Sequence, residues 1–306
     1  MSGDQYLVTG GAGFIGSTLV DALLARGDRV RVLDNLSTGA RSNLAAAEPQ
    51  ITFIEGDIRD ADAVAAACAG CRYVVHLAAQ VSVPQSIADP VDTHAINATG
   101  TLTVLEAAQQ AGVERLVYAS SCAVYGDSAE SPKSEAMSPD PISPYAVSKL
   151  SGEQYAQSYS RLYSLDAVPL RFFNVYGPRQ DPMGAYASVI PKFITMWLAG
   201  KTPTVFGDGT QTRDFVYVAS VVDALLLACK APKAPGLAFN VGSGVETTVN
   251  ELVEMCAGLM SGTIEVTHGP IRSGDIVRSL ADITRARELL GYQGALALGE
   301  GLERTI

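Results

Sequence analysis

The chain has little cysteine, fewer basic than acidic residues and no long apolar run, and each of these shortages excludes a class of protein. Its 306 residues include five cysteines, too few and too scattered for a disulfide framework, so we expect a reducing compartment. With 22 Lys+Arg against 32 Asp+Glu and a net charge of −10, neither nucleic acid nor a membrane surface is an expected partner. No apolar run reaches the ~18 residues of a membrane span, and the opening Met-Ser-Gly-Asp is unlike a signal peptide. We therefore expect a cytoplasmic enzyme.

Neither the cysteines nor the histidines are placed for a metal site. Cys68 and Cys71 have the spacing of a redox or zinc motif, but no second pair and no nearby His completes a set of four ligands. We interpret them as small residues at the end of a helix. The three histidines, His76, His94 and His268, lie in unrelated segments, so no metal triad or Ser/His/Asp arrangement is predicted. His76 is interpreted as a packed strand residue.

Short β-rich apolar runs alternate regularly with helical stretches in the first 175 residues. Between the first two runs, Phe14, Ile15 and Leu19 fall at helical spacing, and Gly27 follows as a stop signal. This alternation predicts an α/β fold with a doubly wound parallel sheet that helices cover on both faces. The predicted strands are 5–9, 29–33, 52–55, 73–77, 115–120 and 166–171.

Beyond Gly177 the alternation loosens, because Gly, Pro and Asp become frequent. We predict a first domain over residues 1–175 and a smaller C-terminal α/β substrate lobe over 176–306, with some segments of the lobe free to return to the first domain. Helices are predicted near 185–199, 218–230, 247–260 and 282–290, and short strands around Thr204, Phe215, Phe239 and Ile264.

The first predicted strand runs into a glycine-rich turn and then directly into a helix. Gly10, Gly13 and Gly16 have a GxxGxxG spacing, which permits a tight turn, close approach of a pyrophosphate and close packing of helix on strand. Asp34 ends the second strand, where an acid binds the adenine ribose hydroxyls and disfavours a 2′-phosphate. The pattern predicts a Rossmann NAD site. Two further segments end strands at the same edge of the sheet, Gly56-Asp57-Ile58 and His76-Leu77-Ala78-Ala79.

Three polar residues follow the fifth strand and open the next helix. Ser121 lies just past the end of the predicted strand, and Tyr145 and Lys149, four residues apart, share one helical face. A phenol with a pKa of about 10 is a poor base at neutral pH, but an adjacent ammonium group and the cationic nicotinamide ring both favour the phenolate. Tyr145 is therefore a candidate general acid/base, and Ser121 can donate a hydrogen bond to the same substrate oxygen.

Together these motifs resemble the extended short-chain dehydrogenase/reductase family, and within it the UDP-hexose 4-epimerases, over essentially the whole chain. Besides the glycine turn and the catalytic residues, the matching motifs are 34–39, 56–58, 76–79, 171–179 and 212–218. The resemblance implies that Tyr145 takes the 4-hydroxyl proton while a hydride passes from C4 to NAD. The 4-keto sugar then turns over while tethered by its nucleotide, and the hydride returns to its other face. Lys149 would hold the nicotinamide ribose and lower the pKa of Tyr145, and NAD would stay bound.

The residues beside Ser121 separate this reaction from others in the same family. The 4,6-dehydratases carry Asp and Glu at the positions of Cys122 and Ala123, and the related decarboxylases carry Glu at Ala123. Neither Cys nor Ala supplies the acid and base that elimination needs. The resemblance therefore implies C4 epimerisation, with a UDP-sugar dehydratase or decarboxylase that uses bound NAD as the alternative. A non-enzymatic sugar-nucleotide sensor is disfavoured, because all three catalytic residues are present.

The resemblance also assigns residues to the cofactor and to a UDP-hexose. Besides the residues named above, the implied NAD contacts are Phe14, Ile15, Asn35, Ser37, Thr38, Gly39, Asn97 and Phe172. The implied substrate contacts are Ser82, Val83, Ser121, Cys122, Tyr145, Asn174, Ser188, Val189, Thr204, Phe206, Arg213, Arg272, Asp275 and Ser279. Among them, Asn174 and the two arginines would bind the diphosphate.

Sugar selectivity and assembly also follow from the resemblance. Some family members have a bulky Tyr at the position of Ser279, which crowds the 2-substituent of the sugar, whereas a small Ser leaves room for an N-acetyl group. We therefore expect UDP-GlcNAc and UDP-GalNAc as substrates, with UDP-Glc and UDP-Gal also accepted. A homodimer is implied through helices near 90–111 and 145–164, although either helix could equally be a covered sheet face.

Overall fold

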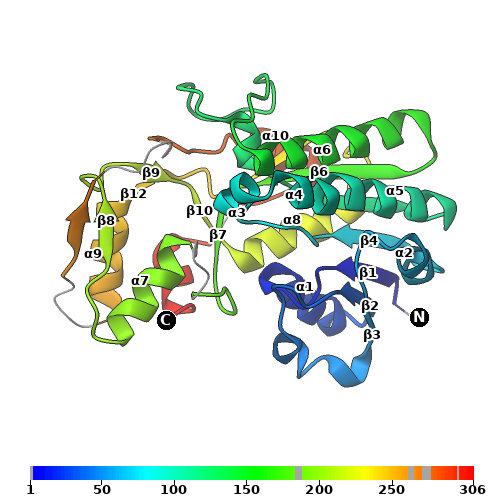
Figure 1. Ribbon diagram of the computed structural model, residues 1–306, viewed down its shortest axis with the longest axis horizontal. Helices are drawn as coiled ribbons and strands as arrows, with labels where there is room; N and C mark the ends of the chain where they lie inside the picture. Colours follow the sequence, from blue (N-terminus) through cyan, green and yellow to red (C-terminus); the bar gives the residue numbers. More distant parts are fainter. Residues whose placement is uncertain (1–2, 183–187, 261–264, 271–276, 295) are drawn as a thin grey trace.

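The computed structural model of the chain describes residues 3–182, 188–260, 265–270, 277–294 and 296–306 (Figure 1). A seven-stranded parallel sheet forms its larger lobe, in the order β11-β6-β5-β4-β1-β2-β3. The order reverses between β1 and β4, where doubly wound sheets bind ligands outside the carboxyl ends of the strands. This confirms the predicted fold class. The strands are β1 (Gln5–Thr9), β2 (Arg29–Asp34), β3 (Ile51–Glu55), β4 (Tyr73–His76), β5 (Arg115–Ser121), β6 (Asp166–Phe172) and β11 (Phe239–Val241).

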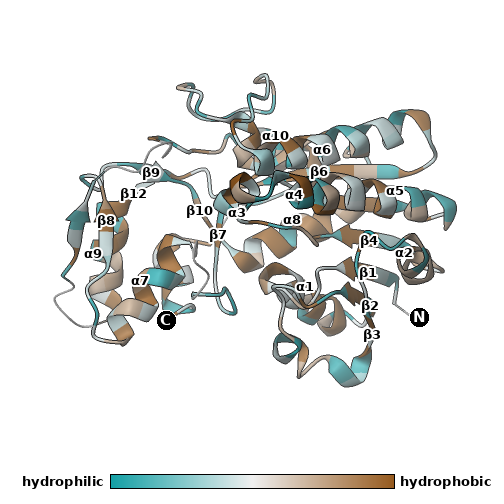
Figure 2. Cartoon of the chain, viewed as in Figure 1, coloured by the Kyte–Doolittle hydropathy of each residue, from teal (hydrophilic) through white to brown (hydrophobic). Residues whose placement is uncertain are grey.

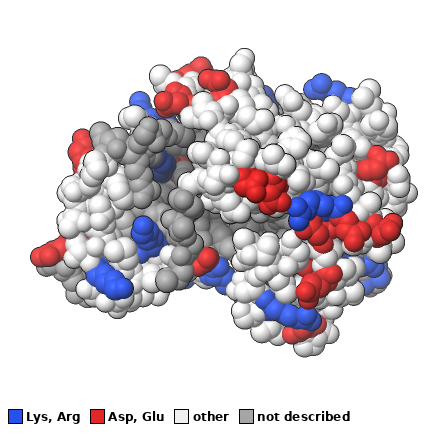
Figure 3. All heavy atoms as spheres, viewed as in Figure 1, with Lys and Arg blue, Asp and Glu red and all other residues white. Residues whose placement is uncertain are grey.

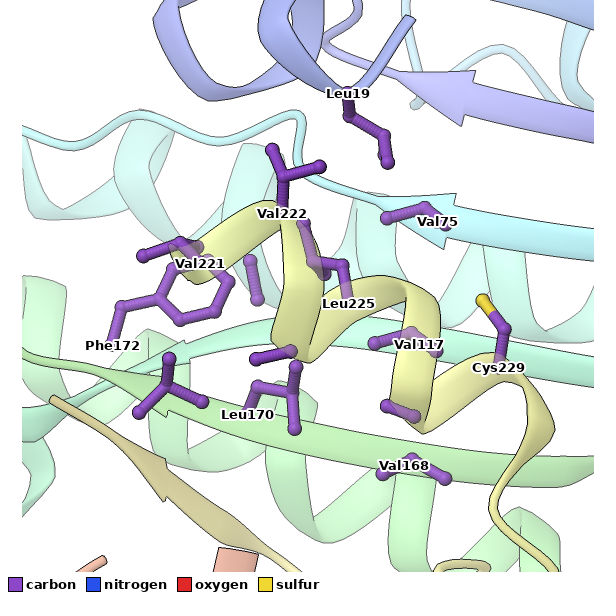
Figure 4. Packing of buried hydrophobic residues seen from close by; sticks show 14 of the residues in the cluster. Leu19, Val75, Val117, Val168, Leu170, Phe172, Val221, Val222, Leu225 and Cys229 are labelled. Atoms are coloured by element: carbon purple, nitrogen blue, oxygen red, sulfur yellow. The ribbon is translucent and has the colours of Figure 1, made fainter. Parts of the chain in front are cut away.

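Helices cover the sheet on both faces, because successive strand residues point to opposite sides. In β1, Tyr6 and Val8 belong to one hydrophobic cluster and Leu7, between them, to the other. Figure 4 shows the first face, where Leu225 of α8 packs near Val117 of β5. The first face carries α1 (Phe14–Ala25), α8 (Val218–Lys230) and α10 (Thr284–Leu290), and the second carries α2 (Ala61–Cys68), α5 (Gly100–Gln110) and α6 (Pro144–Leu162). Figure 2 shows the strands and α8 as largely apolar.

The smaller lobe consists of short two-stranded sheets and helices, at the left of Figure 1. The sheets pair β10 with β7, β12 with β9 and β13 with β8. Ile190, Phe215, Leu252 and Leu302 are buried at its centre. The elements are β7 (Asn174–Tyr176), α7 (Val189–Leu198), β8 (Thr204–Phe206), β9 (Thr212–Arg213), β10 (Phe215–Tyr217), β12 (Thr247–Thr248), α9 (Val249–Leu259), β13 (Thr267–Gly269) and α11 (Leu298–Glu303).

Three segments from the second half of the chain return to the larger lobe. Helices α8 and α10 pack on the sheet, and β11 pairs with β6, with Phe239 opposite Leu170. The sheet therefore extends beyond the 1–175 range in which it was predicted: the strand expected around Phe239 is present as β11, but it joins this sheet and not the smaller lobe. The strand predicted around Ile264 and the start of the helix predicted at 185–199 lie outside the described residues, and β13 lies a few residues after Ile264.

Several short helices were not read from the sequence. Pro90 to Gln110 form one continuous helical run, whose central turn has π-helical hydrogen bonding. Within the described ranges, no helix has the length and apolarity needed to cross a membrane. Helix α4 (Pro90–His94) and the π-helical η3 (Ala95–Thr99) thus form, with α5, the helix expected near 90–111. The elements that were not predicted are α3 (Val83–Ala88) and the 3-10 helices η1 (Arg41–Leu44), η2 (Glu48–Gln50) and η4 (Cys122–Tyr125).

Candidate active site

The glycine turn between β1 and α1 is packed too closely to accept side chains. Gly10 has φ +69°, and a Cβ there would lie 2.7 Å from the backbone nitrogen of Ala78, which follows β4. A Cβ on Gly16 would lie 2.2 Å from the carbonyl oxygen of Gly10. Helix α1 begins after Gly13 without a side-chain cap. The turn thus presents bare backbone and a helix N-terminus at the switch point of the sheet, which fits a dinucleotide pyrophosphate.

Asp34 at the end of β2 holds the glycine turn in place. Its carboxylate is buried and accepts hydrogen bonds from the amides of Ala12 (2.9 Å) and Leu36 (2.8 Å). Each carboxylate oxygen has a second lone pair, so these bonds leave acceptors for ribose hydroxyls. Asp34 therefore fits the predicted ribose site and also positions the turn, a second role that the sequence motif does not reveal.

The predicted loop after Asp34 folds over the glycine turn. The side-chain nitrogen of Asn35 donates to Asp57 (3.0 Å), and its side-chain oxygen accepts the amide of Ser37 (3.1 Å). Arg59 hydrogen-bonds the same carboxylate and holds the pKa of Asp57 at about 2, so Asp57 stays ionised. A Cβ on Gly39 would lie 2.9 Å from the carbonyl carbon of Ala12, and Thr38 lies beside it in this loop.

A buried polar chain connects β4 to the helix that carries Tyr145. His76 is bonded to Thr9 (2.7 Å) and Thr101 (2.9 Å), and burial lowers its pKa to about 3, so it is neutral. This confirms His76 as a packed strand residue. Asn97, in the π-helical turn, binds both backbone polar atoms of Gln80 (2.8 Å each) and donates to Ser148 (3.0 Å). Asn97 thus fastens the loop that contains Leu77, Ala78 and Ala79 to α6.

The three candidate catalytic residues meet at the carboxyl edge of the sheet. Ser121 ends β5, and its hydroxyl accepts the amide of Ala123 (3.1 Å). Helix α6 starts after the N-cap Ser143 with Pro144 in its first turn, which places Tyr145 and Lys149 one turn apart. The Lys149 ammonium is buried and donates to the carbonyl of Ala119 in β5 (2.9 Å). Helix α6 is therefore tied to the strand that bears Ser121.

Burial controls the protonation of these groups. It raises the pKa of Tyr145 to about 12, although a hydrogen bond with Ser121 opposes the shift. Burial also lowers the pKa of Lys149 to about 7. The resemblance implies that Lys149 lowers the pKa of Tyr145, but in the chain alone burial of the phenol outweighs any such effect. Tyr145 is consequently a protonated phenol at neutral pH until a further cation enters the pocket.

A buried ion pair beneath these residues was missed in the sequence. Arg171 of β6 donates to Glu153 of α6 through Nη2 (2.5 Å) and Nε (3.0 Å), and Ser120 donates to the same carboxylate (2.7 Å). Glu153 lies one helical turn after Lys149, on the face of α6 that packs against the sheet. A charged residue at this spacing is the sequence signal that could have indicated the ion pair. A Cβ on Gly152 would lie 2.4 Å from Tyr118 Oη, so α6 packs tightly on β5.

The residues expected to bind substrate lie in both lobes, and Figure 3 shows a hollow between these lobes. Asn174 and Arg213 meet at Asp214, whose carbonyl accepts the side-chain nitrogen of Asn174 (3.2 Å). Ser279 is buried, and Ser188 is at the N-cap position of α7, ahead of Val189, without a side-chain cap. Ser82 caps α3 ahead of the exposed Val83. Thr204 and Phe206 lie on β8, which is at the left of Figure 1, away from α6. Ile58 and Phe172 are buried at strand ends. Arg272 and Asp275 lie outside the described residues.

The Cys68–Cys71 pair lies at the end of α2, as predicted. Both thiols are buried, and burial raises the pKa of Cys68 to about 12 and also raises that of Cys71. Neither forms a thiolate at neutral pH, so the pair is not poised for redox chemistry or metal binding.

Comparison with known proteins agrees with this geometry. The profile of the NAD dependent epimerase/dehydratase family matches residues 6–242. A UDP-glucose 4-epimerase from Mycolicibacterium smegmatis is 47% identical, over 99% of this chain and 97% of its own length. The structure of a UDP-N-acetylglucosamine 4-epimerase from Methanobrevibacter ruminantium, in complex with UDP-N-acetylmuramic acid, superposes with a TM-score of 0.95 at 38% identity, over 100% of this chain and 97% of that one.

The cofactor prediction is confirmed by the same comparisons. The structure of a Thermus thermophilus UDP-glucose 4-epimerase in complex with NAD superposes with a TM-score of 0.89 at 40% identity, over 98% of this chain and 97% of that one. Glycines without space for a Cβ and an acid at the end of β2 are the features that NAD needs. The chain is therefore an NAD-dependent enzyme that belongs to the NAD dependent epimerase/dehydratase family, among the extended short-chain dehydrogenases/reductases.

Proposed function

We propose that this enzyme is a UDP-hexose 4-epimerase that interconverts UDP-GlcNAc with UDP-GalNAc and UDP-Glc with UDP-Gal. The observation that carries the proposal is the meeting of Ser121, Tyr145 and Lys149 beside the glycine turn, without a further acid or base next to Ser121. Such a site can remove and return one proton and one hydride, and Cys122 and Ala123 next to Ser121 supply no acid and base for an elimination.

The mechanism assigns one step to each side chain. Bound NAD would take up the hydride of sugar C4 and later return it. Tyr145 removes the proton of the 4-hydroxyl and gives it back in the second half-reaction. Ser121 donates a hydrogen bond to the same oxygen, and Lys149 holds the cofactor ribose. Because burial keeps the Tyr145 phenol protonated in the chain alone, the phenolate forms only when the cationic nicotinamide shares the pocket.

The state of Cys122 supports epimerisation over dehydration. Burial and the nearby carboxylate of Asp214 raise the pKa of the Cys122 thiol to about 11, so it stays neutral. Ala123, the next residue, has no ionisable group. A dehydratase needs an acid and a base at these two positions to remove water from the 4-keto sugar, and this chain supplies neither.

The proposed binding residues divide between the two nucleotides. For NAD, they are Gly10, Gly13, Phe14, Ile15, Gly16, Asp34, Asn35, Ser37, Thr38, Gly39, Asp57, Ile58, Leu77, Ala78, Ala79, Asn97, Tyr145, Lys149 and Phe172. For the UDP-sugar, Asn174, Arg213 and Arg272 bind the diphosphate, and Ser188, Val189, Thr204, Phe206 and Asp275 bind the uridine half. Ser82, Val83, Cys122 and Ser279 line the sugar pocket beside Ser121 and Tyr145.

The N-acetyl substrates are supported by Ser279. Its small side chain is 6% exposed, two residues before Ala281, whose amide donates to Asp214 (3.1 Å). The carboxylate charge of Asp214 contributes to the raised pKa of Cys122, the residue next to Ser121. Ser279 therefore belongs to a segment anchored behind the catalytic residues. The similarity to a UDP-N-acetylglucosamine 4-epimerase from Methanobrevibacter ruminantium supports the same proposal.

We also propose that the enzyme works as a homodimer in the cytoplasm, where its free cysteines stay reduced. Val147, Tyr155 and Leu162 recur at helical spacing on α6 and are 47%, 42% and 75% exposed. Ile87 of α3 (65%) and Val91 of α4 (78%) extend the same apolar face, since both helices pack beside α6. An apolar face of this extent, continuous with the catalytic helix, fits a second copy of the chain.

Replacing the catalytic phenol tests the mechanism. Tyr145→Phe should reduce epimerisation by about 10²- to 10⁴-fold, because the proton acceptor is lost. UDP-Glc, UDP-GlcNAc and UDP-GlcA are incubated without added NAD and followed by NMR. Tyr155→Phe, on the exposed face of the same helix, is the control and should retain wild-type rates. A wild-type rate for Tyr145→Phe contradicts the mechanism, and a wild-type product that has lost water or CO₂ indicates a dehydratase or decarboxylase.

Removing the buried ammonium should stabilise the fold at the expense of activity. The pKa of Lys149 falls from 10.5 to about 7 on folding. Burial of the ammonium charge therefore lowers the free energy of unfolding by its full amount below pH 7, by less as the pH rises, and not at all above pH 10.5. Lys149→Met should therefore raise the free energy of unfolding by about 1–3 kcal/mol at pH 6, with the gain fading towards pH 10. Urea titrations of NAD-free protein at pH 6, 8 and 10 measure it, and a pH-independent gain would refute the argument.

The size of residue 279 should decide the choice of sugar. Ser279→Tyr should lower kcat/KM for UDP-GlcNAc by about 10-fold or more, because the ring fills the space of the N-acetyl group, while UDP-Glc is still turned over. Ser279→Ala keeps the side chain small and should leave both activities intact. If Ser279→Tyr lowers both activities equally, residue 279 does not line the sugar pocket.

A charge on the proposed dimer face should separate the subunits. Val147→Arg places a cation in the centre of the apolar face and should convert the dimer to a monomer at micromolar concentration. Light scattering coupled to gel filtration measures the mass. Val245→Arg, at a residue of the other lobe that is 61% exposed, serves as the control. A wild-type enzyme that is already monomeric would disprove the dimer.

A further inference from the structure

Asp214, between β9 and β10, is a carboxylate with no exposed surface. Its Oδ1 accepts the backbone amide (2.6 Å) and the hydroxyl (2.7 Å) of Ser243, and its Oδ2 accepts the amides of Gly244 (3.0 Å) and Ala281 (3.1 Å). All four donors are uncharged. Consecutive amides that converge in this way, with Gly244 at φ +71°, form a backbone nest for an anion.

The backbone of the same residue holds a second segment. The Asp214 carbonyl accepts both the backbone amide (3.1 Å) and the side-chain nitrogen (3.2 Å) of Asn174. Arg213 precedes Asp214 in the chain, and Ser279 lies two residues before Ala281. Three proposed substrate contacts, on segments far apart in the sequence, therefore converge on one buried residue.

The surroundings of Asp214 leave no room for adjustment. A Cβ on Gly242 would lie 2.7 Å from Oδ2 of Asp214 and equally close to the Cβ of Ala281. Gly242 belongs to the chain that leaves β11, whereas Ala281 belongs to the segment that forms a bridge with Lys133. The Asp214 carboxylate thus packs between the segment of Gly242, which leaves the large sheet, and the segment of Ala281, which follows Ser279 of the proposed substrate pocket.

We propose that Asp214 is a positioning residue for the substrate, which sets Asn174, Arg213 and Ser279 at the spacing that a nucleoside diphosphate sugar requires. It acts through these residues and does not touch the substrate, since it is fully buried. The inference rests on the proposed function, because that function identifies the three residues as substrate contacts. The Asp214 carboxylate also adds to the effect of burial, which is the main cause that raises the pKa of the Cys122 thiol.

Two variants of the NAD-loaded enzyme test this role. Asp214→Asn places an amide nitrogen either opposite two backbone N–H groups, which loses two hydrogen bonds, or opposite Ser243, whose hydroxyl can turn to accept but whose amide loses its partner. At least one hydrogen bond is therefore lost whichever way the amide turns. Ser243→Ala removes a single donor and is the milder variant. Asp60→Asn makes the same chemical change at a carboxylate that accepts two backbone amides on the exposed end of α2, and it is the matched control. KM and kcat for UDP-Glc and UDP-GlcNAc, the Kd for UDP alone and the NAD content are measured.

The expected pattern is a split between binding and turnover. Asp214→Asn should raise KM and the Kd for UDP by about 10- to 100-fold, with kcat within about threefold and NAD content unchanged. Ser243→Ala should raise both by about 3- to 10-fold, and Asp60→Asn should leave them unchanged. A purely structural role would instead lower kcat, NAD content and UDP affinity together.

Three outcomes decide the matter. The positioning role is overturned if both variants keep wild-type KM values and UDP affinity. It is also overturned if kcat and NAD content fall together with the UDP affinity. If Asp214→Asn does not fold, Ser243→Ala decides alone by the same criteria. A wild-type enzyme that turns over no UDP-sugar refutes the proposed function itself, which keeps the two failures distinct.

Discussion

The buried ion pair between Glu153 and Arg171 is the constraint on which the rest of the site depends. The two side chains are 2% and 5% exposed, and they join α6 to β6, while Ser120 adds β5 to the same carboxylate. Burying two charges costs on the order of several kcal/mol per ion, and their mutual attraction offsets this cost only where the geometry is good, so a shift of α6 against β6 would leave two buried charges unpaired. Lys149 lies one turn before Glu153 and Ser121 directly after Ser120. The ion pair therefore sets the position of catalytic groups that it does not touch.

Burial also decides the chemistry that these groups perform. The same apolar surroundings raise the pKa of Tyr145 and of Cys122 and lower that of Lys149, so the pocket of the chain alone holds a neutral phenol and a neutral thiol. Such a pocket responds strongly to a single added cation, because charges interact more strongly where water is excluded. An oxidised nicotinamide brings that cation, which links the basicity of Tyr145 to cofactor binding. Burial of Lys149 lowers the stability of the fold, and the residue is retained for its function.

Much of the larger lobe could be predicted, because its signals are local. The six strands before residue 175, the glycine turn and the Tyr145–Lys149 spacing each depend on residues close together in the chain, and the structure places them as expected. The short strand around Phe239 was predicted, but its place beside β6 in the large sheet was not, because pairing with Leu170 joins distant parts of the chain. The Glu153–Arg171 pair and Asp214 were missed because a charged residue in a sequence is usually solvated, and only the fold shows that these are buried.

The fold class, the cofactor and the candidate catalytic residues could be read from the sequence alone, because hydrophobic period, glycine geometry and one-turn spacing act over a few residues at a time. The partner of each buried group emerged only from the three-dimensional fold. Lys149 binds a strand carbonyl, Asn97 fastens a loop to α6 and Asp214 gathers three segments from both halves of the chain. These pairings join residues up to 67 positions apart, as for Ala281 and Asp214, and no local pattern in the sequence encodes such a distance.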